Sequence, residues 1–453
     1  MKARFCLGLV ALGAASGCML LPRGFVDQEQ RSREAAAVYL EPLAQRPIPP
    51  IEQEPSLDGL VEYAWRNNGE IRAALLEWIA AVERVREQAG YPNTNLHLAL
   101  EAMWRGGDAS WNDVTIGLGN DPMTNLALPI KVAAAARLAL EEARAAEAKF
   151  WAKRLALREQ VASRFADWVA TTRRLALARE RAEWLARGEQ SLAASLEAGQ
   201  TSQDAWIRAR AELLLARNDV ADLVAQEAVL RSELNALLGR SPGAPLGAAA
   251  APPPLVAPNR SWEALYQELM AGNAELAGLR AEVAARQRAL ELARLQFLPD
   301  VNPMLAFTGE PSRTIGAALV LPLTWRRLQA QVANLDALLR ASRAMLEQEQ
   351  TTKTSELATA LVLVENLDRQ RRLWEEQLLP DFRLVCATLR QAYEANTVPL
   401  AEWARAEAAR TEVEARLEEI IALREQQVAR ADRLLGRFGP GGAPARAEVA
   451  HGN

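Results

Sequence analysis

Long stretches of the chain carry apolar residues at helical spacing and contain neither glycine nor proline. In the first of them, Val161, Trp168, Leu175 and Ala182 recur every seven residues, which is the spacing that helix-on-helix packing requires. At about 1.5 Å per residue, this stretch alone would form a helix on the order of 85 Å long. The pattern therefore predicts long coiled-coil helices, over residues 131–187, 200–238 and 323–379.

Shorter segments alternate apolar and polar positions with a period of two. Every second residue from Leu96 to Trp104 is apolar, and Val114, Ile116 and Leu118 repeat the alternation after a turn. This pattern predicts a β-hairpin. A helical pattern over 57–88 and Pro92 precede it. A second helix, Pro299 and a second hairpin, at about 301–309 and 314–321, come later in the chain. Pro303 falls in its first strand, where proline is tolerated mainly at an edge or a strand start.

The order of these elements is written twice. Trp206 and Arg208 return as Trp403 and Arg405, 197 residues later, and the motif LLGR ends each half at the same offset. A helix, a hairpin, a long helix, a turn and a further helix are therefore expected twice, with Gly188 and Gly199 interrupting the first long helix. The expected boundaries are a first repeat over 56–240, a Pro/Ala-rich linker over 241–260, a second repeat over 261–438 and a flexible tail over 439–453.

The N-terminus predicts export. Lys2 and Arg4 precede a short apolar run that ends in the small residues of ASG and then Cys18. This is typical of a secretory signal, residues 1–17, followed by a lipidated cysteine and a tether over 18–55. The alternative is an ordinary cleaved signal with an incidental cysteine. Cys6 would leave with the signal, so Cys386 would be a lone, small buried residue.

Composition excludes several classes of protein. The net charge of −4 leaves no basic surface for nucleic acid, and two histidines and three cysteines offer little for a metal or catalytic site. No phosphate loop, catalytic carboxylate pair or nucleophile elbow is present. We expect no enzyme activity, no cofactor and no metal site.

Four strands are too few to close a barrel, for which about eight is near the lower limit. Open strand edges are not stable in lipid, so several chains should complete one barrel.

This arrangement resembles the outer-membrane efflux channel family, the TolC-type outer-membrane factors. The motifs that carry the resemblance are the duplicated N-x-E-(I/L) helix entries at Asn68 and Asn273, the proline before each hairpin, LP(I/L) after each hairpin, Pro380 in the third long helix, and the paired turns. The resemblance implies a mainly α fold with a β-barrel part, in which duplicated coiled-coil hairpins form a trimeric α-barrel and β-barrel tunnel.

The resemblance also implies a function, which is passive export across the outer membrane as one component of a tripartite efflux or secretion system. The implied partners are two further copies of the chain, outer-membrane lipid, a periplasmic adaptor protein and an inner-membrane pump. The exported substrate stays open between metal ions, drugs and peptides. The alternative is a periplasmic coiled-coil lipoprotein that tethers or scaffolds without conducting.

Two sets of site residues follow from the resemblance. Adaptor contact is implied at the turn residues, although helix capping alone would also explain threonine there. A tunnel constriction is implied at three further residues, although charged residues on helices are commonly just solvated. Val398 stands where the family has a basic partner for Tyr393. The turn residues are Gly199, Gln200, Thr201, Asn396, Thr397 and Val398, and the constriction residues are Glu402, Asp204 and Tyr393.

Overall fold

A computed structural model describes most of the chain, and most of the described residues are helical. The described ranges are 19–37, 39, 51, 53–90, 96–102, 114–120, 127–248, 254–258, 260–308 and 312–438. The expected signal, Cys18 and the tail over 439–453 lie outside them. The described chain divides into two compact units, one formed by 1–40, 73–151 and 274–350, and the other by 41–72, 152–273 and 351–453. Each unit combines segments from both repeats.

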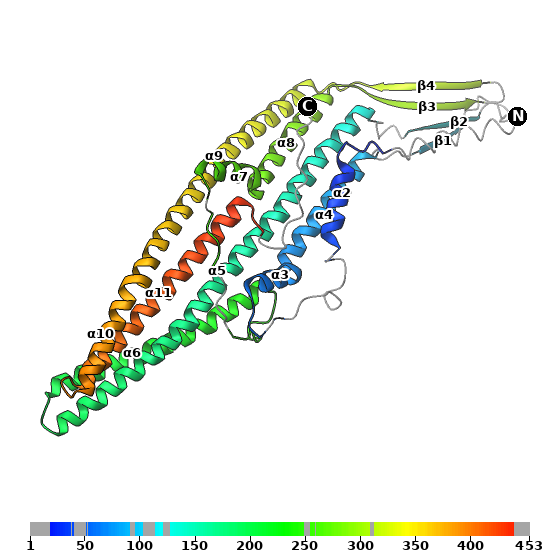
Figure 1. The fold of residues 1–453 in the computed structure, drawn as a ribbon. Helices are drawn as coiled ribbons and strands as arrows, with labels where there is room; N and C mark the ends of the chain where they lie inside the picture. Colours follow the sequence, from blue (N-terminus) through cyan, green and yellow to red (C-terminus); the bar gives the residue numbers. More distant parts are fainter. Residues whose placement is uncertain are drawn as a thin grey trace. The chain divides into compact units, whose positions relative to one another are not determined.

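The elements follow the predicted order, twice (Figure 1). The first repeat contains α3 (Leu57–Asn67), α4 (Gly69–Ala89), β1 (Leu96–Ala102), β2 (Val114–Asn120), α5 (Pro129–Glu197) and α6 (Gln203–Leu237). The second contains α7 (Trp262–Gly272), α8 (Ala274–Leu295), β3 (Asp300–Thr308), β4 (Ser312–Val320), α9 (Trp325–Leu373), a π-helical turn η3 (Trp374–Leu378), α10 (Leu379–Glu394) and α11 (Leu400–Leu435).

One helix lies in the segment expected to be only a tether. Helix α2 (Phe25–Ala36) forms in a stretch without proline. Phe25 is buried beneath the guanidinium of Arg86, 5.4 Å from its ring centroid, and Gln28 Nε2 donates to Glu147 Oε2 at 3.0 Å. This part of the N-terminal segment therefore packs against α4 and α5 of its own unit.

The four strands form one antiparallel sheet in the order β1-β2-β3-β4, as Figure 1 shows. Both predicted hairpins are confirmed, and Leu118 opposite Leu305 pairs the two repeats with each other. Within the part of the sheet that the structure describes, Pro303 pairs only with Ala317 of β4, because the ladder between β2 and β3 ends at Met304. A proline without an N–H therefore stands where β3 has a partner on one side only.

No helix among the described residues is both long and apolar enough to span a membrane.

Helix α5 runs for 69 residues without a break, so the expected interruption at Gly188 is wrong. A Cβ at Gly188 would lie 3.2 Å from the Cβ of Ala404. The glycine therefore lets α11 approach α5 closely.

Pro380 changes the hydrogen-bond pattern of the third predicted long helix instead of ending that helix. Proline has no N–H to donate and its ring crowds the preceding turn. The chain responds with η3, in which the N–H of Leu379 donates to the carbonyl of Trp374. A π-turn of this kind is a recognised way to accommodate an irregular position inside a long helix.

The duplicated motifs form the same joint twice. The side-chain amide of Asn68 donates to Leu237 O at 2.9 Å, and that of Asn273 donates to Leu434 O at 2.9 Å. Each asparagine thus ties the break between two short helices to the end of the last helix of its own repeat. The predicted equivalence of Asn68 and Asn273 is confirmed.

Candidate functional site

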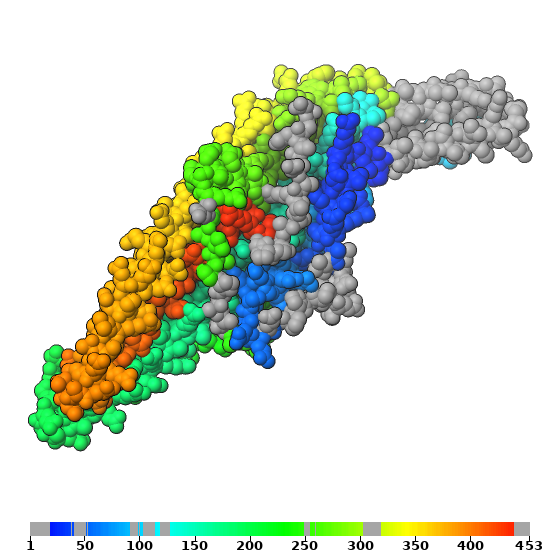
Figure 2. All heavy atoms as spheres, in the orientation of Figure 1, coloured from blue at the N-terminus to red at the C-terminus, as the bar shows by residue number. Residues whose placement is uncertain are grey.

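Two helix turns lie at the same end of one compact unit, the one formed by 41–72, 152–273 and 351–453, as Figures 1 and 2 show. The first joins α5 to α6. Gly199 adopts a left-handed conformation with φ 69°, and the N–H of Gln200 donates to Ser195 O at 2.8 Å. This is the Schellman arrangement, which satisfies carbonyls at a helix end. Ser202 then caps α6 by accepting from the N–H of Ala205.

The second turn, between α10 and α11, repeats this geometry without a glycine. Asn396 adopts the left-handed conformation with φ 56° and is the one non-glycine residue with a positive φ in the described ranges. The N–H of Thr397 donates to Ala392 O at 2.9 Å, and its hydroxyl donates to the same oxygen at 2.8 Å. Asparagine tolerates this conformation better than most residues. Pro399 occupies the N-cap position of α11.

The six candidate contact residues therefore come together at one end of the unit. Gly199, Gln200, Asn396 and Thr397 are exposed, whereas Thr201 and Val398 are half-buried. Helix capping accounts for the local geometry of both turns. Exposure leaves the same residues available to a partner.

Aromatic side chains fix the helices behind the turns. The Trp184 and Trp403 rings lie 5.0 Å apart between centroids, and Tyr393 lies 5.6 Å from Trp403. The duplicated tryptophans use their indole N–H groups differently. Trp206 donates to Glu189 on α5 at 2.6 Å, and Trp403 donates to Glu407 on its own helix at 3.2 Å. The tryptophans therefore pack the helices behind the turns against one another.

The three candidate constriction residues differ in their surroundings. Glu402 is exposed in the first turn of α11. Asp204 is exposed but forms an ion pair with Arg208 at 3.0 Å, one turn along the same helix. Tyr393 packs against Trp403. Of the two acidic residues, Glu402 thus has the carboxylate that is less engaged within its own helix.

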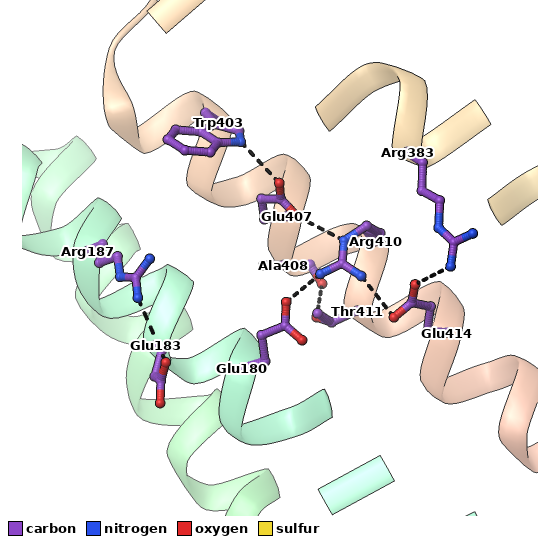
Figure 3. Close-up of polar contacts among 10 residues, drawn as sticks. All are labelled: Glu180, Glu183, Arg187, Arg383, Trp403, Glu407, Ala408, Arg410, Thr411 and Glu414. Atoms are coloured by element: carbon purple, nitrogen blue, oxygen red, sulfur yellow. Dashed lines mark hydrogen bonds and ion pairs between the residues drawn. The ribbon is translucent and has the colours of Figure 1, made fainter. Parts of the chain in front are cut away.

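An ion-pair network that sequence reasoning missed lies behind the second turn (Figure 3). Arg410 contacts Glu407 at 2.8 Å, Glu414 at 2.9 Å and also Glu180 of α5. Arg383 of α10 donates to Glu414 at 3.2 Å. The network therefore joins α5, α10 and α11. Its signal in the sequence is the i, i+3 and i, i+4 spacing of Glu407, Arg410 and Glu414.

The electrostatics of this cluster favour a fixed charge on Arg410. Burial opposes the charged form of Arg410, but the hydrogen bond to Glu407 and the charges of Glu414 and Glu180 outweigh it and raise its pKa above the ordinary value. Cys386 lies beside the same groups. Burial, followed by the charge of Glu407, raises the pKa of the Cys386 thiol to about 11. A thiol that stays protonated is a poor nucleophile, which fits the prediction of a small buried residue.

Within the described ranges, no group of three or more His, Cys, Asp or Glu side chains is arranged to hold a metal ion.

Comparison with solved structures identifies the class of fold. The chain has the fold of outer-membrane channels, with long coiled-coil hairpins and small β-hairpins, over most of its length. No family model and no curated protein sequence matches the chain.

Three solved structures illustrate the similarity. The open state of the MtrE outer membrane channel of Neisseria gonorrhoeae has a TM-score of 0.68 at 19% identity, covering 84% of this chain and 89% of that one. The outer membrane protein VceC of Vibrio cholerae has a TM-score of 0.67 at 18% identity, covering 84% and 96%. The CmeC outer membrane channel of Campylobacter jejuni has a TM-score of 0.68 at 13% identity, covering 89% and 91%. The resemblance predicted from the sequence is confirmed at the level of the fold.

Proposed function

We propose that this chain is the outer-membrane channel of a tripartite efflux or secretion system and conducts exported substrates passively to the exterior. The observation that carries the proposal is the fold, which the chain shares over most of its length with solved outer-membrane channels. Energy would come from an inner-membrane pump, reached through a periplasmic adaptor protein.

The channel is proposed to be a homotrimer. The register aligns Leu98, Leu118, Leu305 and Ile315 in one row across the sheet, and Leu98 and Leu100 of β1 are largely exposed. Strand β1 pairs only with β2, and β4 only with β3, among the described residues. Unpaired strand edges invite pairing with another chain. Strands of neighbouring copies would thus close one barrel in the outer membrane.

The exposed turns are the proposed docking points for the adaptor. Each copy offers two of them, at 199–202 and 396–399, with the same Schellman geometry. Repetition around a ring of copies would strengthen a contact that is small at each turn.

The chain is also proposed to be anchored to the outer membrane by an acyl group on Cys18, which lies outside the described residues. The support is the short apolar run and the small residues before that cysteine.

Conductance in a planar lipid bilayer tests the proposed channel against the alternative of a tether that does not conduct. The purified full-length protein should produce stepwise current increments, and Glu402→Ala should lower its preference for cations, because the exposed carboxylate would line a narrow passage. Glu263→Ala, which removes an exposed acidic residue of α7, is the matched control and should leave the ion preference unchanged.

The two parts of this proposal fail separately. A protein that inserts into the bilayer but passes no current would favour the tether. Identical ion preference in Glu402→Ala and the wild type would contradict only the constriction.

A further inference from the structure

Exposed apolar side chains gather where helices adjoin the strands in one compact unit, the one formed by 1–40, 73–151 and 274–350. Figure 1 shows β3 and β4 extending from the ends of α8 and α9. Six large apolar residues at the strand ends and the adjoining helix ends are each at least 40% exposed. They are Ile130, Leu298, Leu319, Leu321, Leu323 and Trp325. This place in the fold thus presents an apolar surface that the chain itself leaves uncovered.

Side-chain contacts hold these segments together. The Phe297 and Trp325 rings lie 5.7 Å apart between centroids, so the end of α8 lies beside the start of α9. Lys131 Nζ, in the first turn of α5, donates to Leu298 O at 2.8 Å and to Asp300 Oδ1 at 2.7 Å. The helix ends of both repeats therefore meet beside the start of β3. We call residues 294–300 and 319–327 the strand–helix joint.

Three arginines of the joint carry charge that the chain does not neutralise. Arg294 lies in the last turn of α8, and Arg326 and Arg327 lie in the first turn of α9. All three are exposed, and none forms an ion pair with a described residue. The sequence has no acidic residue between 311 and 335, and Asp300 is already paired with a lysine. The joint is therefore a local site of net positive charge.

The duplicated fold does not require unpaired cations at this place. In the first repeat, the last turn of α4 carries Arg86 and the first turn of α5 carries Lys131, and both are paired with carboxylates. Aligning LPI with LPL, the motifs that follow the two hairpins, sets Ala133 and Ala134 at the positions of the two α9 arginines. The unpaired arginines of the joint thus have no unpaired counterpart in the first repeat, which points to a ligand rather than to folding.

The chemistry of the joint is that of a membrane–water interface. Tryptophan is enriched at this level of membrane proteins, and arginine lays its apolar stem along such a surface while its charged end stays among polar groups. The guanidinium group also matches a phosphate with two parallel hydrogen bonds. Exposed leucines continue from the joint into the strands, with Leu319 on β4 and Leu98 on β1. These features together fit a phospholipid better than a protein surface.

We propose that the strand–helix joint binds anionic glycerophospholipid headgroups at the periplasmic surface of the outer membrane. Leu323 and Trp325 lie at the edge of the acyl region, and the three joint arginines contact the phosphates. The proposal rests on the proposed function for the position of the strands in that membrane. It adds a lipid class and the residues that select it.

The N-terminal segment reaches another helix end that leads to the strands. The N–H of Leu20 donates to the carbonyl of Ala89, the last residue of α4, at 2.9 Å. Met19 and Leu21 on either side are exposed. Cys18, proposed above to carry an acyl group, directly precedes Met19 in the sequence. Acylation there would bring lipid to the end of α4, in agreement with a lipid surface where helices meet strands.

Native mass spectrometry of the full-length protein in detergent tests the headgroup site. The protein is titrated with phosphatidylglycerol, which is anionic, or with phosphatidylcholine, which is zwitterionic, and the apparent Kd of each lipid is measured. Arg326→Gln/Arg327→Gln removes two joint arginines. Arg340→Gln/Arg343→Gln is the matched control, because it removes two exposed arginines of the same helix that lie about 20 Å further from the strands.

The wild type should bind phosphatidylglycerol more tightly than phosphatidylcholine. The joint variant should weaken phosphatidylglycerol binding roughly 25-fold, from about fivefold for each arginine near an anionic lipid surface, and leave phosphatidylcholine binding unchanged. The control variant should bind both lipids like the wild type. The proposal would be overturned by unchanged phosphatidylglycerol binding in the joint variant, by an equal loss in both variants or for both lipids, or by displacement of the lipid by inorganic phosphate at the same concentration.

Tryptophan fluorescence tests the apolar part of the site independently. The full-length protein is reconstituted in phosphatidylglycerol vesicles that contain lipid brominated near its ester groups, because bromine quenches a tryptophan that it touches. The emission that is lost in Trp325→Phe should be quenched in the wild type. The emission that is lost in Trp403→Phe, behind the helix turns, should not. An unquenched Trp325 in protein that floats with the vesicles would assign this surface to water or to a protein partner and overturn the proposal.

Failure of the lipid site can be told apart from failure of the channel. A protein that conducts but binds both lipids equally would retain the channel and reject the site. A protein that selects phosphatidylglycerol through Arg326 and Arg327 but passes no current would retain the site and reject conduction.

Discussion

Single glycines hold the duplicated joints in place. Gly436 has φ 72°, and a Cβ there would lie 2.1 Å from the backbone oxygen of Gly272, which no rotation of a side chain can relieve. Gly239, its counterpart in the first repeat, has φ 68° and faces the backbone of Asn67 at 3.0 Å. A left-handed conformation and a close backbone approach both require glycine. The repeated LLGR motif is thus a helix terminus docked against a helix break.

The neighbouring arginines show where the repeats diverge. Arg437 forms two bonds with Glu268, at 2.6 and 2.9 Å, and the hydrogen bond to Arg437 lowers the pKa of Glu268. Tyr63 occupies the position equivalent to Glu268, and Arg240 stacks over its ring at 5.9 Å. The same arginine therefore packs in both repeats against partners of different chemistry.

The prediction at the residue scale concerns Cys18. Cells grown with a radioactive fatty acid should label the wild-type protein and not Cys18→Ser, because the thiol is the proposed site of acylation. Cys386→Ala, which removes the buried cysteine of α10, is the control and should label like the wild type. Equal labelling of Cys18→Ser and the wild type would contradict the lipid anchor.

At the scale of elements, periodicity predicted most of the fold. The heptad spacing in residues 131–187 lies within α5, and the alternation from Leu96 to Ala102 falls within β1, whereas Trp104 lies outside the described residues. Gly188 misled the prediction because its role depends on Ala404, a residue on a helix far along the chain. The effect of Pro380 was not predictable either, because its ring is accommodated by a π-turn that no spacing in the sequence reveals.

The site was predictable in outline only. The repeated sequence motif located both helix turns. Asn396 takes the left-handed conformation that asparagine tolerates. The bond of Arg410 to Glu180 was not predicted, because Glu180 lies on α5 and the alignment of α5 with α11 is set by tertiary packing. Trp403 has Glu407 four residues on as an acceptor, whereas Trp206 has Arg210 at that position and donates to Glu189 of α5 instead.

The prediction at the element scale concerns the turns. Gly199→Asp and Thr397→Trp should leave the oligomer intact and weaken binding of the adaptor, because they place charge or bulk on exposed turn surfaces. Gly199→Asp also puts a side chain on a residue with φ 69°, so Gly199→Asn is the matched control for backbone strain. The measurement is cross-linking in cells between this protein and a periplasmic adaptor protein that is produced with it. If both variants cross-link like the wild type, docking at the turns is wrong.

At the scale of the whole molecule, a single chain leaves many large apolar side chains exposed. Leu98 and Leu100 of β1 are exposed, as are Leu214 of α6 and Leu384 of α10. Large exposed apolar patches mark sites of association or of contact with a membrane. Open strand edges and open helix edges in one chain both point to assembly as the step that completes the protein.

The most direct test of this account is to count the copies in the assembled protein by native mass spectrometry of the full-length chain extracted in detergent. The account predicts a single dominant species with the mass of three chains, stable on dilution, because both the strands and the helix edges need neighbours. A folded, stable monomer would contradict it, since one chain could then satisfy its own edges and would have no route to a closed channel.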